Sequence, residues 1–360
     1  MYQNYKVVVN TAAGRRRYMQ YLVPPILNAD IVDRYDIWVN THNMVDIEFF
    51  KKLAKKYPKV NLVWQPDGVV NGIASINAFY RDCCDKDTIY MKLDDDVVWF
   101  EPELFEKMVK FRVDNPEYFL VSPLVINNAL STYLLQVHNK IKLDKYYMSI
   151  CMERTISLDG WFAADLHNWF MEKYLTTGKY QELYVGKHPM AMGRFSINCI
   201  LWFGGEMAEF KGEVPGDDEE FLSCIKPTQL GKANCFNGDA LIAHFAFGTQ
   251  REGLDKMDIL NRYGNILHEL WKQDETMRKI DVSVQQMMEE VETREDELSA
   301  LPSPYRHVPK ERETFAMRWG KKLPEKVRCA IRELQRKRQY KFIELSLIHI
   351  SEPTRLQLIS

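Results

Sequence analysis

An alternation of strand and helix patterns over the first 130 residues is the feature that most constrains how this chain can fold. Amphipathic helix patterns separate short apolar runs that are rich in β-branched residues. These runs predict strands at residues 5–10, 35–40, 60–64, 88–93 and 119–126. Such an alternation is typical of a mostly parallel sheet with right-handed crossovers and helices on its faces. We therefore expect an α/β, Rossmann-like fold.

Length and composition set broad limits. The chain of 360 residues is long enough for one large α/β domain with an appendage, or for two domains. Its apolar fraction of 46% and charged fraction of 27% are ordinary for a soluble globular protein. A formal net charge of -2 exerts no general attraction on nucleic acid, so no specific nucleic-acid partner is expected. The seven cysteines lack metal-ligand spacing and indicate reduced thiols.

The N-terminus and the apolar runs bear on where the chain works. Residues 1–5 are polar and lead directly into the first predicted strand, so we expect no signal peptide. No apolar run approaches the roughly 18 residues that a membrane-spanning helix needs. The expected location is the cytoplasm, with peripheral attachment to the inner face of the membrane as a further possibility.

The strongest chemical signal is the segment YMKLDDDVVWF, in which an apolar strand leads into Asp94, Asp95 and Asp96. In an open parallel sheet, ligands bind beyond the carboxyl ends of the strands. Three crowded carboxylates repel one another unless a cation compensates them. Hard oxygen ligands suit Mg²⁺ or Mn²⁺, which also bridge to phosphate oxygens. The triplet predicts a metal–diphosphate site, and the alternative is a solvated acidic turn.

With this motif about ninety residues in, residues 5–250 resemble the glycosyltransferases of the GT-A fold, and among them the family-2-like enzymes of bacterial polysaccharide synthesis. In that family an Asp-x-Asp or Asp-Asp-Asp motif follows a nucleotide-binding half-sheet. The resemblance implies that Asp96 ligates the metal, that Asp94 contacts the ribose or the metal, and that Asp95 contacts the sugar. It also implies Mn²⁺ or Mg²⁺ as cofactor and a nucleoside diphosphate sugar as co-substrate.

A second acidic element, VPGDDEEFLS, begins at Val214 and opens a short helix with four acidic residues. Carboxylates are favoured at a helix N-terminus by the helix dipole, so simple capping accounts for the segment taken alone. The resemblance makes it the family's catalytic element, in which a carboxylate deprotonates the acceptor hydroxyl. The predicted base is Asp218, with Asp217 as the alternate.

One histidine, His244, lies inside the apolar run ALIAHFAFG. A lone histidine in such a run is commonly a core residue with satisfied hydrogen bonds. The resemblance instead implies that a histidine after the base helix completes the coordination of the metal, and imidazole suits Mn²⁺ better than Mg²⁺. Both roles for His244 stay open.

Weaker expectations complete the nucleotide site. The further candidates are Thr11, Ala12, Arg15, Asp67, Arg81, Gly204 and Gly205. The first three follow the first strand, where the family binds the nucleotide. Asp67 ends the third strand and is a candidate for a base contact, whereas Arg81 is one for the diphosphate because arginine binds phosphate bidentately. The two glycines would let the backbone approach the donor sugar closely.

The C-terminal part is strongly charged. Residues 305–341 hold thirteen Lys and Arg against four Glu, which favours either a solvated extension or attachment to an anionic membrane surface. Residues 345–355, LSLIHISEPTR, resemble the in-frame translation of a sequencing adapter. That resemblance implies a non-native tail from about residue 345.

Together these observations predict a GT-A-like domain at residues 1–275, a helical, charged extension at 276–344 and a non-native tail at 345–360. The expected reaction is metal-dependent, inverting transfer of a sugar from the nucleotide-sugar donor to a hydroxyl of a glycan or lipid-linked acceptor. One alternative is a nucleotidyltransferase acting on a sugar phosphate, although the loop at residues 11–15 is poor in the glycine that such enzymes usually carry. Another is a non-catalytic sugar-binding module on the same fold.

Overall fold

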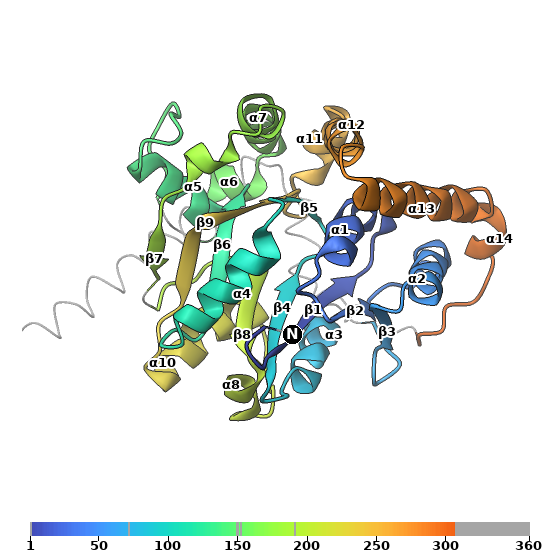
Figure 1. Ribbon diagram of the computed structural model, residues 1–360, viewed down its shortest axis with the longest axis horizontal. Coiled ribbons are helices and arrows are strands. Elements are labelled where there is room, and N and C mark those ends of the chain that lie inside the picture. Colours follow the sequence, from blue (N-terminus) through green and yellow to red (C-terminus); the bar gives the residue numbers. More distant parts are fainter. Residues whose placement is uncertain (1, 71–72, 149–150, 152, 191, 307–360) are drawn as a thin grey trace, which may run out of the picture. The chain divides into compact units, whose positions relative to one another are not determined.

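Strands and helices alternate along the first half of the chain (Figure 1). The computed structural model describes residues 2–70, 73–148, 151, 153–190 and 192–306. The strands within this part are β1 (Lys6–Ala13), β2 (Arg34–Val39), β3 (Val60–Trp64), β4 (Thr88–Leu93), β5 (Val97–Phe100), β6 (Val121–Ile126), β7 (Lys187–Pro189), β8 (Cys199–Phe203) and β9 (Cys235–His244).

The helices connect these strands and cover the sheet. The longer α-helices are α1 (Arg16–Asn28), α2 (Met44–Lys56), α4 (Leu104–Asp114), α5 (Ala129–Val137), α7 (Gly160–Phe170), α12 (Ile259–Trp271) and α13 (Glu275–Glu292). The short ones are α3 (Ile73–Asn77), α6 (Arg154–Leu158), α8 (Gly204–Ala208), α9 (Asp218–Glu220), α10 (Lys226–Leu230), α11 (Arg251–Lys256) and α14 (Glu295–Ser299). Two 3₁₀ turns, η1 (Ala78–Asp82) and η3 (Tyr180–Leu183), and two π-helical turns, η2 (Met171–Leu175) and η4 (Phe221–Ile225), complete the set.

The strands form one mixed sheet in the order β3-β2-β1-β4-β8-β6-β9-β5, and β7 pairs with β9. β3, β2, β1 and β4 are mutually parallel. β8 is antiparallel to both β4 and β6, and β9 is parallel to β6. The two reversals at β8 give β9 the same direction as β1 and β4. The carboxyl ends of β1, β4 and β9 therefore lie at the same edge of the sheet.

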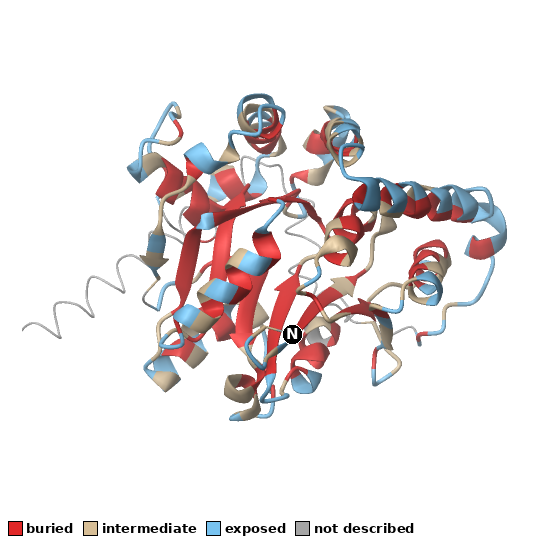
Figure 2. Cartoon of the chain, in the orientation of Figure 1, coloured by how far each residue is buried: buried red, intermediate tan, exposed pale blue. Residues whose placement is uncertain are grey.

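Apolar side chains pack on both faces of this sheet. Because side chains alternate along a strand, Val7 and Val9 of β1 pack in one apolar layer and Val8 packs in the other. Helices α2, α4 and α13 complete the first layer, and η1, α5 and α7 complete the second. The central strands are consequently buried on both sides, as Figure 2 shows, which explains why their sequences are continuous apolar runs.

The predicted fold class is confirmed, since a Rossmann-like, curled sheet is flanked by helices. Strands β3 and β4 have the predicted bounds, whereas β5 and β8, which pair with strands distant in the sequence, were not predicted. Helix α13 packs against α1 and α2 (Figure 1). The domain boundary at residue 275 stays a prediction. The proposed adapter-like tail, and the basic segment beyond Arg306, lie outside the described residues. No helix in the described part is both long and apolar enough to cross a membrane.

A buried histidine gives the fold a pH dependence. His167 on α7 is fully buried, with Nε2 2.8 Å from the carbonyl oxygen of Phe245 and Nδ1 2.9 Å from the hydroxyl of Tyr263. A carbonyl oxygen only accepts, so Nε2 carries the proton and Nδ1 accepts from the tyrosine. Burial lowers the pKa of His167 to about 4. The neutral ring therefore belongs to the folded state.

We expect acidification to destabilise the protein through this group. Between the ordinary histidine pKa of 6.5 and about 4, the unfolded chain binds a proton that the folded chain does not, so the free energy of unfolding falls as the pH falls. Lowering the pH from 7 to 4.5 should remove about 2 kcal/mol through His167 alone. Urea unfolding of the parent and of His167→Gln at both pH values measures the difference. Equal losses of unfolding free energy in both proteins would contradict the role of the buried, neutral His167.

Candidate functional site

The acidic triplet lies at the edge where β1, β4 and β9 end. β4 delivers Asp94, Asp95 and Asp96 in a turn, after which the chain returns as β5. β9 ends at His244, which pairs with Val97 across the β5–β9 ladder. The loop after β1 reaches the same place. The sheet topology thus brings together three segments that are far apart in the sequence, at the edge where α/β proteins bind ligands.

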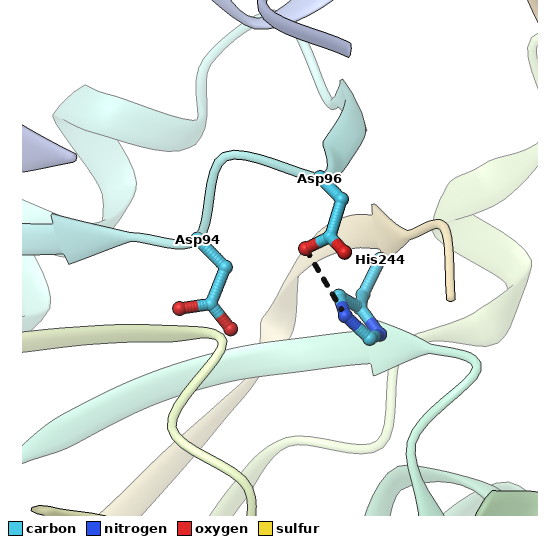
Figure 3. Close-up of side chains that lie close together, drawn as sticks. All are labelled: Asp94, Asp96 and His244. Carbon is cyan, nitrogen blue, oxygen red and sulfur yellow. Dashed lines mark ion pairs between the residues drawn. The ribbon is translucent and has the colours of Figure 1, made fainter. Parts of the chain in front are cut away.

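The three residues predicted as metal ligands lie close together. Asp94, Asp96 and His244 each offer one ligand atom, and these atoms lie within 4.8 Å of one another (Figure 3). Asp96 and His244 are 3% exposed each, and His244 Nε2 lies 3.4 Å from Asp96 Oδ1. Burial by itself would lower the pKa of His244, but the neighbouring Asp96 carboxylate raises it. The ligand role itself stays a proposal.

The donor set fits a divalent cation. Two carboxylate oxygens and an imidazole nitrogen are ligands that Mn²⁺ accepts together, and Mg²⁺ accepts the two oxygens. Metal–ligand bonds of about 2.0–2.2 Å put the ligand atoms roughly 3–4.4 Å apart. The observed spread of up to 4.8 Å therefore needs an adjustment of only a few tenths of an ångström. Three protein ligands leave further coordination positions for oxygens of a substrate.

The Asp95 carboxylate is bound by the loop after β1. It accepts from the backbone N–H of Gly14 at 2.9 Å and from Arg15 Nε at 3.1 Å, and Arg15 Nη2 also bonds to it. The same guanidinium lies 3.0 Å from Asp96 Oδ2. Burial raises the pKa of Asp95, with Arg15 offsetting it in part. For Asp96, His244 and the nearby arginines overcome the effect of burial and hold its pKa well below the ordinary value.

Asp94 is held by two residues that sequence analysis missed. Lys92, 4% exposed within β4, donates to Asp94 Oδ1 at 2.6 Å and to the carbonyl oxygen of Ile197 at 3.0 Å. Asn198 donates to the other oxygen of Asp94 at 3.0 Å. Lys92 could have been found from the sequence, because a lysine inside an apolar strand, two residues before the triplet, is unusual. Asn198 had no such signal, because it lies in an irregular segment before β8.

The second acidic element contributes another wall. Asp217 caps α9 by accepting from the backbone N–H of Glu219 at 3.0 Å, and it pairs with Arg194 Nη2 at 2.7 Å. Arg194 Nε also lies 2.9 Å from Glu219 Oε1. Asp218 accepts from the hydroxyl of Tyr80 at 3.0 Å. Capping therefore describes Asp217, whereas Asp218 has a neutral hydroxyl as its partner.

These walls enclose a cavity of about 460 Å³. It is lined by Ala12, Arg15, Ile76, Lys92, Asp94, Asp95, Asp96, Arg194, Ile197, Asn198, Asp217, Asp218, Glu219, His244, Ala246, Phe247, Gly248 and Arg251. Arg251 on α11, which the sequence did not single out, has Nη2 3.5 Å from Asp96 Oδ2. Two guanidinium atoms in this cavity, Arg15 Nη1 and Arg251 Nε, are buried without a hydrogen-bond partner. Unsatisfied cationic donors of this kind indicate an anionic ligand.

Five predicted nucleotide-site residues do not line this cavity. They are Thr11, Asp67, Arg81, Gly204 and Gly205. Thr11 is buried within β1, Asp67 lies in the turn after β3, and Arg81 is exposed on η1. The two glycines follow β8, whose last residue pairs with Ile89 near the start of β4. Because β8 is antiparallel to β4, its end lies at the opposite edge of the sheet from the acidic triplet.

Gly204 and Gly205 differ in how closely other parts of the backbone approach them. A Cβ atom on Gly204 would lie 2.1 Å from the carbonyl oxygen of Asp85, whereas one on Gly205 would find nothing closer than 3.8 Å. We expect Gly204→Ala to lower the free energy of unfolding by about 2 kcal/mol, since overpacking costs about 1–3 kcal/mol. Gly205→Ala, the matched control, should change it by less than about 1 kcal/mol. Urea denaturation measures both, and equal effects would contradict the close approach.

Known proteins similar to this chain are found among solved structures, and not among family models or curated proteins. No protein-family model matches the chain, and the search of curated proteins finds no match. Among solved structures, the chain is similar to a CMP:2-keto-3-deoxy-manno-octonic acid synthetase complexed with CTP, with a TM-score of 0.38 and 9% identity over 72% of this chain and 99% of that one. A 4-diphosphocytidyl-2C-methyl-D-erythritol synthase from Anaerococcus prevotii DSM 20548 has a TM-score of 0.38 and 13% identity, over 73% and 96%. A mannose-6-phosphate isomerase from Helicobacter pylori has a TM-score of 0.30 and 13% identity, over 70% and 88%.

These comparisons correct the predicted function. The first two structures are nucleotidyltransferase-like, so the prediction of a glycosyltransferase that uses a nucleotide-sugar donor is wrong, and the nucleotidyltransferase alternative is favoured. All three TM-scores lie below 0.5, so the function proposed next is argued from the side chains of the cavity.

Proposed function

We propose that the chain is a divalent-metal-dependent nucleotidyltransferase that joins the nucleotidyl group of a nucleoside triphosphate to a sugar phosphate. The observation that carries the proposal is the pairing, in one cavity, of the Asp94–Asp96–His244 cluster with buried, unpartnered guanidinium donors. The cluster suits a metal ion and the donors suit phosphate oxygens. A metal-bound polyphosphate satisfies both at once.

The charge balance of the metal wall, which consists of the acidic triplet with Lys92, Arg15 and Arg251, supports a polyphosphate as ligand. The three carboxylates of the triplet are matched by three cations, Lys92, Arg15 and Arg251, each of which lies within 3.5 Å of one of them. The wall is therefore near neutrality before a metal ion binds, with His244 counted as neutral. A divalent ion adds two positive charges in a largely buried place, where electrostatic interactions are screened little. The loaded site would attract the phosphates of a nucleotide rather than repel them.

The acidic wall supports a polyhydroxylated co-substrate. Asp218 has a hydroxyl and a backbone N–H as partners, and Glu219 faces the same cavity. Carboxylates accept hydrogen bonds from sugar hydroxyls through their remaining lone pairs. The ion pairs of Arg194 with Asp217 and Glu219 fix this wall in place. We assign the sugar to this side of the cavity and the phosphates to the metal side.

In the proposed reaction, an oxygen of the sugar phosphate attacks the α-phosphorus of the nucleotide. A new P–O bond forms, the bond from the α-phosphorus to the bridging oxygen breaks, and pyrophosphate leaves. A phosphate monoester is ionised near neutral pH, so it needs no general base, and the base role predicted for Asp218 or Asp217 falls with the glycosyltransferase. Arg15 and Arg251 bind phosphate oxygens, and Lys92 and Asn198 orient Asp94. A divalent ion, when bound, neutralises charge on the leaving pyrophosphate.

Pyrophosphate release tests the proposal. The chain is incubated with each of the four ribonucleoside triphosphates and a panel of hexose and pentose phosphates, with Mn²⁺, with Mg²⁺ or with EDTA. We expect one nucleotide to be converted into a nucleotide-sugar with stoichiometric pyrophosphate, and EDTA to stop the reaction. Metal-dependent thermal stabilisation by the same triphosphate provides a readout that does not require the correct sugar. Absence of stabilisation by all four triphosphates would refute the proposal.

We expect Asp218→Asn to weaken sugar binding selectively. An amide keeps the shape of the carboxylate but accepts fewer hydrogen bonds, so KM for the sugar phosphate should rise about tenfold, a loss of about 1.4 kcal/mol of binding. KM for the triphosphate should change little, because Asp218 lies on the acidic wall. Glu220→Gln, an exposed neighbour that does not line the cavity, is the matched control. A parallel rise in both KM values would place Asp218 with the nucleotide instead.

A further inference from the structure

A second cavity, of about 480 Å³, lies away from the acidic triplet. It is formed by the end of α1, the β5–α4 connection, the turns η2 and η3, the end of α12 and the start of α13. None of its lining residues lines the first cavity. Its size falls within the range of small-molecule sites, about 300–1,000 Å³. Nothing in the proposed nucleotidyl transfer uses it.

Aromatic and apolar side chains make its inner walls. Trp99, 5% exposed, meets the ring of Tyr180 edge to face, with the ring centroids 5.4 Å apart. Trp271 on α12 also lines the cavity and is only partly buried. Leu267 and Met277 are buried beside these rings. Aromatic rings therefore form part of the cavity wall.

Carboxylates surround these rings, and no Lys or Arg side chain is among the lining residues. The acidic lining residues are Asp30, Glu101, Glu103, Glu106 and Asp274. Asp30, Glu103 and Glu106 are exposed and form no ion pair within the described residues, while Glu101 is buried and paired with Lys107 at 2.9 Å. The nearby Lys59 ammonium donates to the carbonyl oxygens of Leu27 and Ala29 at 2.9 and 2.7 Å. Lys59 also attracts Asp30 and Glu106, but five carboxylates against the two ammonium groups of Lys59 and Lys107 still leave an excess of negative charge at the cavity.

We propose that this second cavity binds an organic cation with an apolar body, such as a quaternary or primary alkylammonium group. A cation is attracted by the π electrons of an aromatic ring, and the carboxylates that line the same cavity attract the same charge. An anionic ligand would be repelled by the exposed carboxylates that line the cavity. A neutral apolar ligand would contact the apolar walls but would gain nothing from the negative charge of the carboxylates.

Choline and its neutral isostere 3,3-dimethyl-1-butanol test the proposal on the whole chain. The two molecules have nearly the same shape, so the difference between their dissociation constants reports the charge. Isothermal titration at low salt is expected to show choline binding at least tenfold more tightly than the alcohol. Raising the salt to 0.5 M should weaken choline binding severalfold, because ions screen the exposed carboxylates. Equal binding of both probes, or binding of neither, would overturn the proposal.

Two sets of variants locate the site. The double variant Glu103→Gln and Glu106→Gln, both exposed, should weaken choline binding at least fivefold without affecting the fold, and Trp271→Leu should do the same through the aromatic wall. The control, Glu269→Gln with Glu289→Gln, removes the same charge from exposed positions outside the cavity and should bind as the parent does. Equal effects in the test and control pairs would mean that only net charge matters and would refute the site. No nucleotide or metal is present, so the outcome is independent of the proposed nucleotidyl transfer.

Discussion

Replacing Asp96 by asparagine is expected to abolish metal binding and to lower pyrophosphate release by about a thousandfold or more. Asp96 Oδ1 lies 3.4 Å from His244 Nε2 in the metal cluster, and its buried carboxylate stays ionised under the influence of His244 and the arginines. An amide has the same size but carries no charge and is a poor metal ligand. A bound divalent ion contributes several kcal/mol of transition-state stabilisation, and each 1.36 kcal/mol corresponds to a factor of ten in rate.

The test of this variant needs a readout other than turnover. Mn²⁺ should raise the melting temperature of the parent and leave that of Asp96→Asn unchanged, since an ion stabilises only the state that binds it. Asp114→Asn is the matched control, because Asp114 is half-exposed on α4 and pairs only with Lys110 among the described residues. That variant should keep both activity and metal-linked stabilisation. If Asp96→Asn still responds to Mn²⁺ as the parent does, the metal site has been misassigned.

The parallel half of the sheet could be predicted because its strands are apolar runs separated by amphipathic helices. That periodicity is local, and it gave β3 and β4 their correct bounds. The antiparallel half could not be predicted in the same way. β8 follows an irregular segment and not an amphipathic helix, and β5 has only four residues, immediately after three aspartates. Each forms because distant strands offer it hydrogen bonds and a buried surface, and this information is not present in a local window of sequence.

The residues of the candidate site likewise differ in whether a local sequence pattern marks them. Asp94 and Asp96 could be predicted as candidates because carboxylates that follow a buried strand are conspicuous, and His244 because it interrupts an apolar run. Arg194 and Asn198 were missed because they lie in irregular segments where polar residues are common. Gly204 lies at the opposite edge of the sheet from the acidic triplet, which could not be foreseen because the direction of β8 in the sheet was unknown. The direction of a strand decides at which edge of the sheet the residues after it lie. That direction depends on pairing with strands that are distant in the sequence.

Replacing Arg15 by methionine is expected to destabilise the metal-free protein by about 3 kcal/mol. Arg15 bonds to Asp95 and lies 3.0 Å from Asp96, and the side chains of these aspartates are only 7% and 5% exposed. Burial raises the pKa of Asp95 even in the presence of Arg15, which shows how weakly water solvates this carboxylate. Removing one partner of a buried ion pair leaves an uncompensated charge, which costs about 3–5 kcal/mol. Methionine retains the length and packing of the arginine stem, so the loss reports the charge.

The neighbouring arginine provides the control, and metal separates the two roles of Arg15. Arg17 pairs with Asp255 between side chains that are 44% and 45% exposed, so Arg17→Met should cost less than about 1 kcal/mol. Mn²⁺ should restore part of the stability of Arg15→Met, because an ion on Asp96 replaces one of the two lost interactions while Asp95 remains unpaired. Urea denaturation of both variants, in EDTA and in Mn²⁺, measures these effects. If Arg15→Met in EDTA is no less stable than Arg17→Met, the two buried carboxylates do not depend on Arg15 for their charge balance. The metal wall would then not be held near neutrality by Arg15, and the proposed affinity for polyphosphate would not follow from its charge balance.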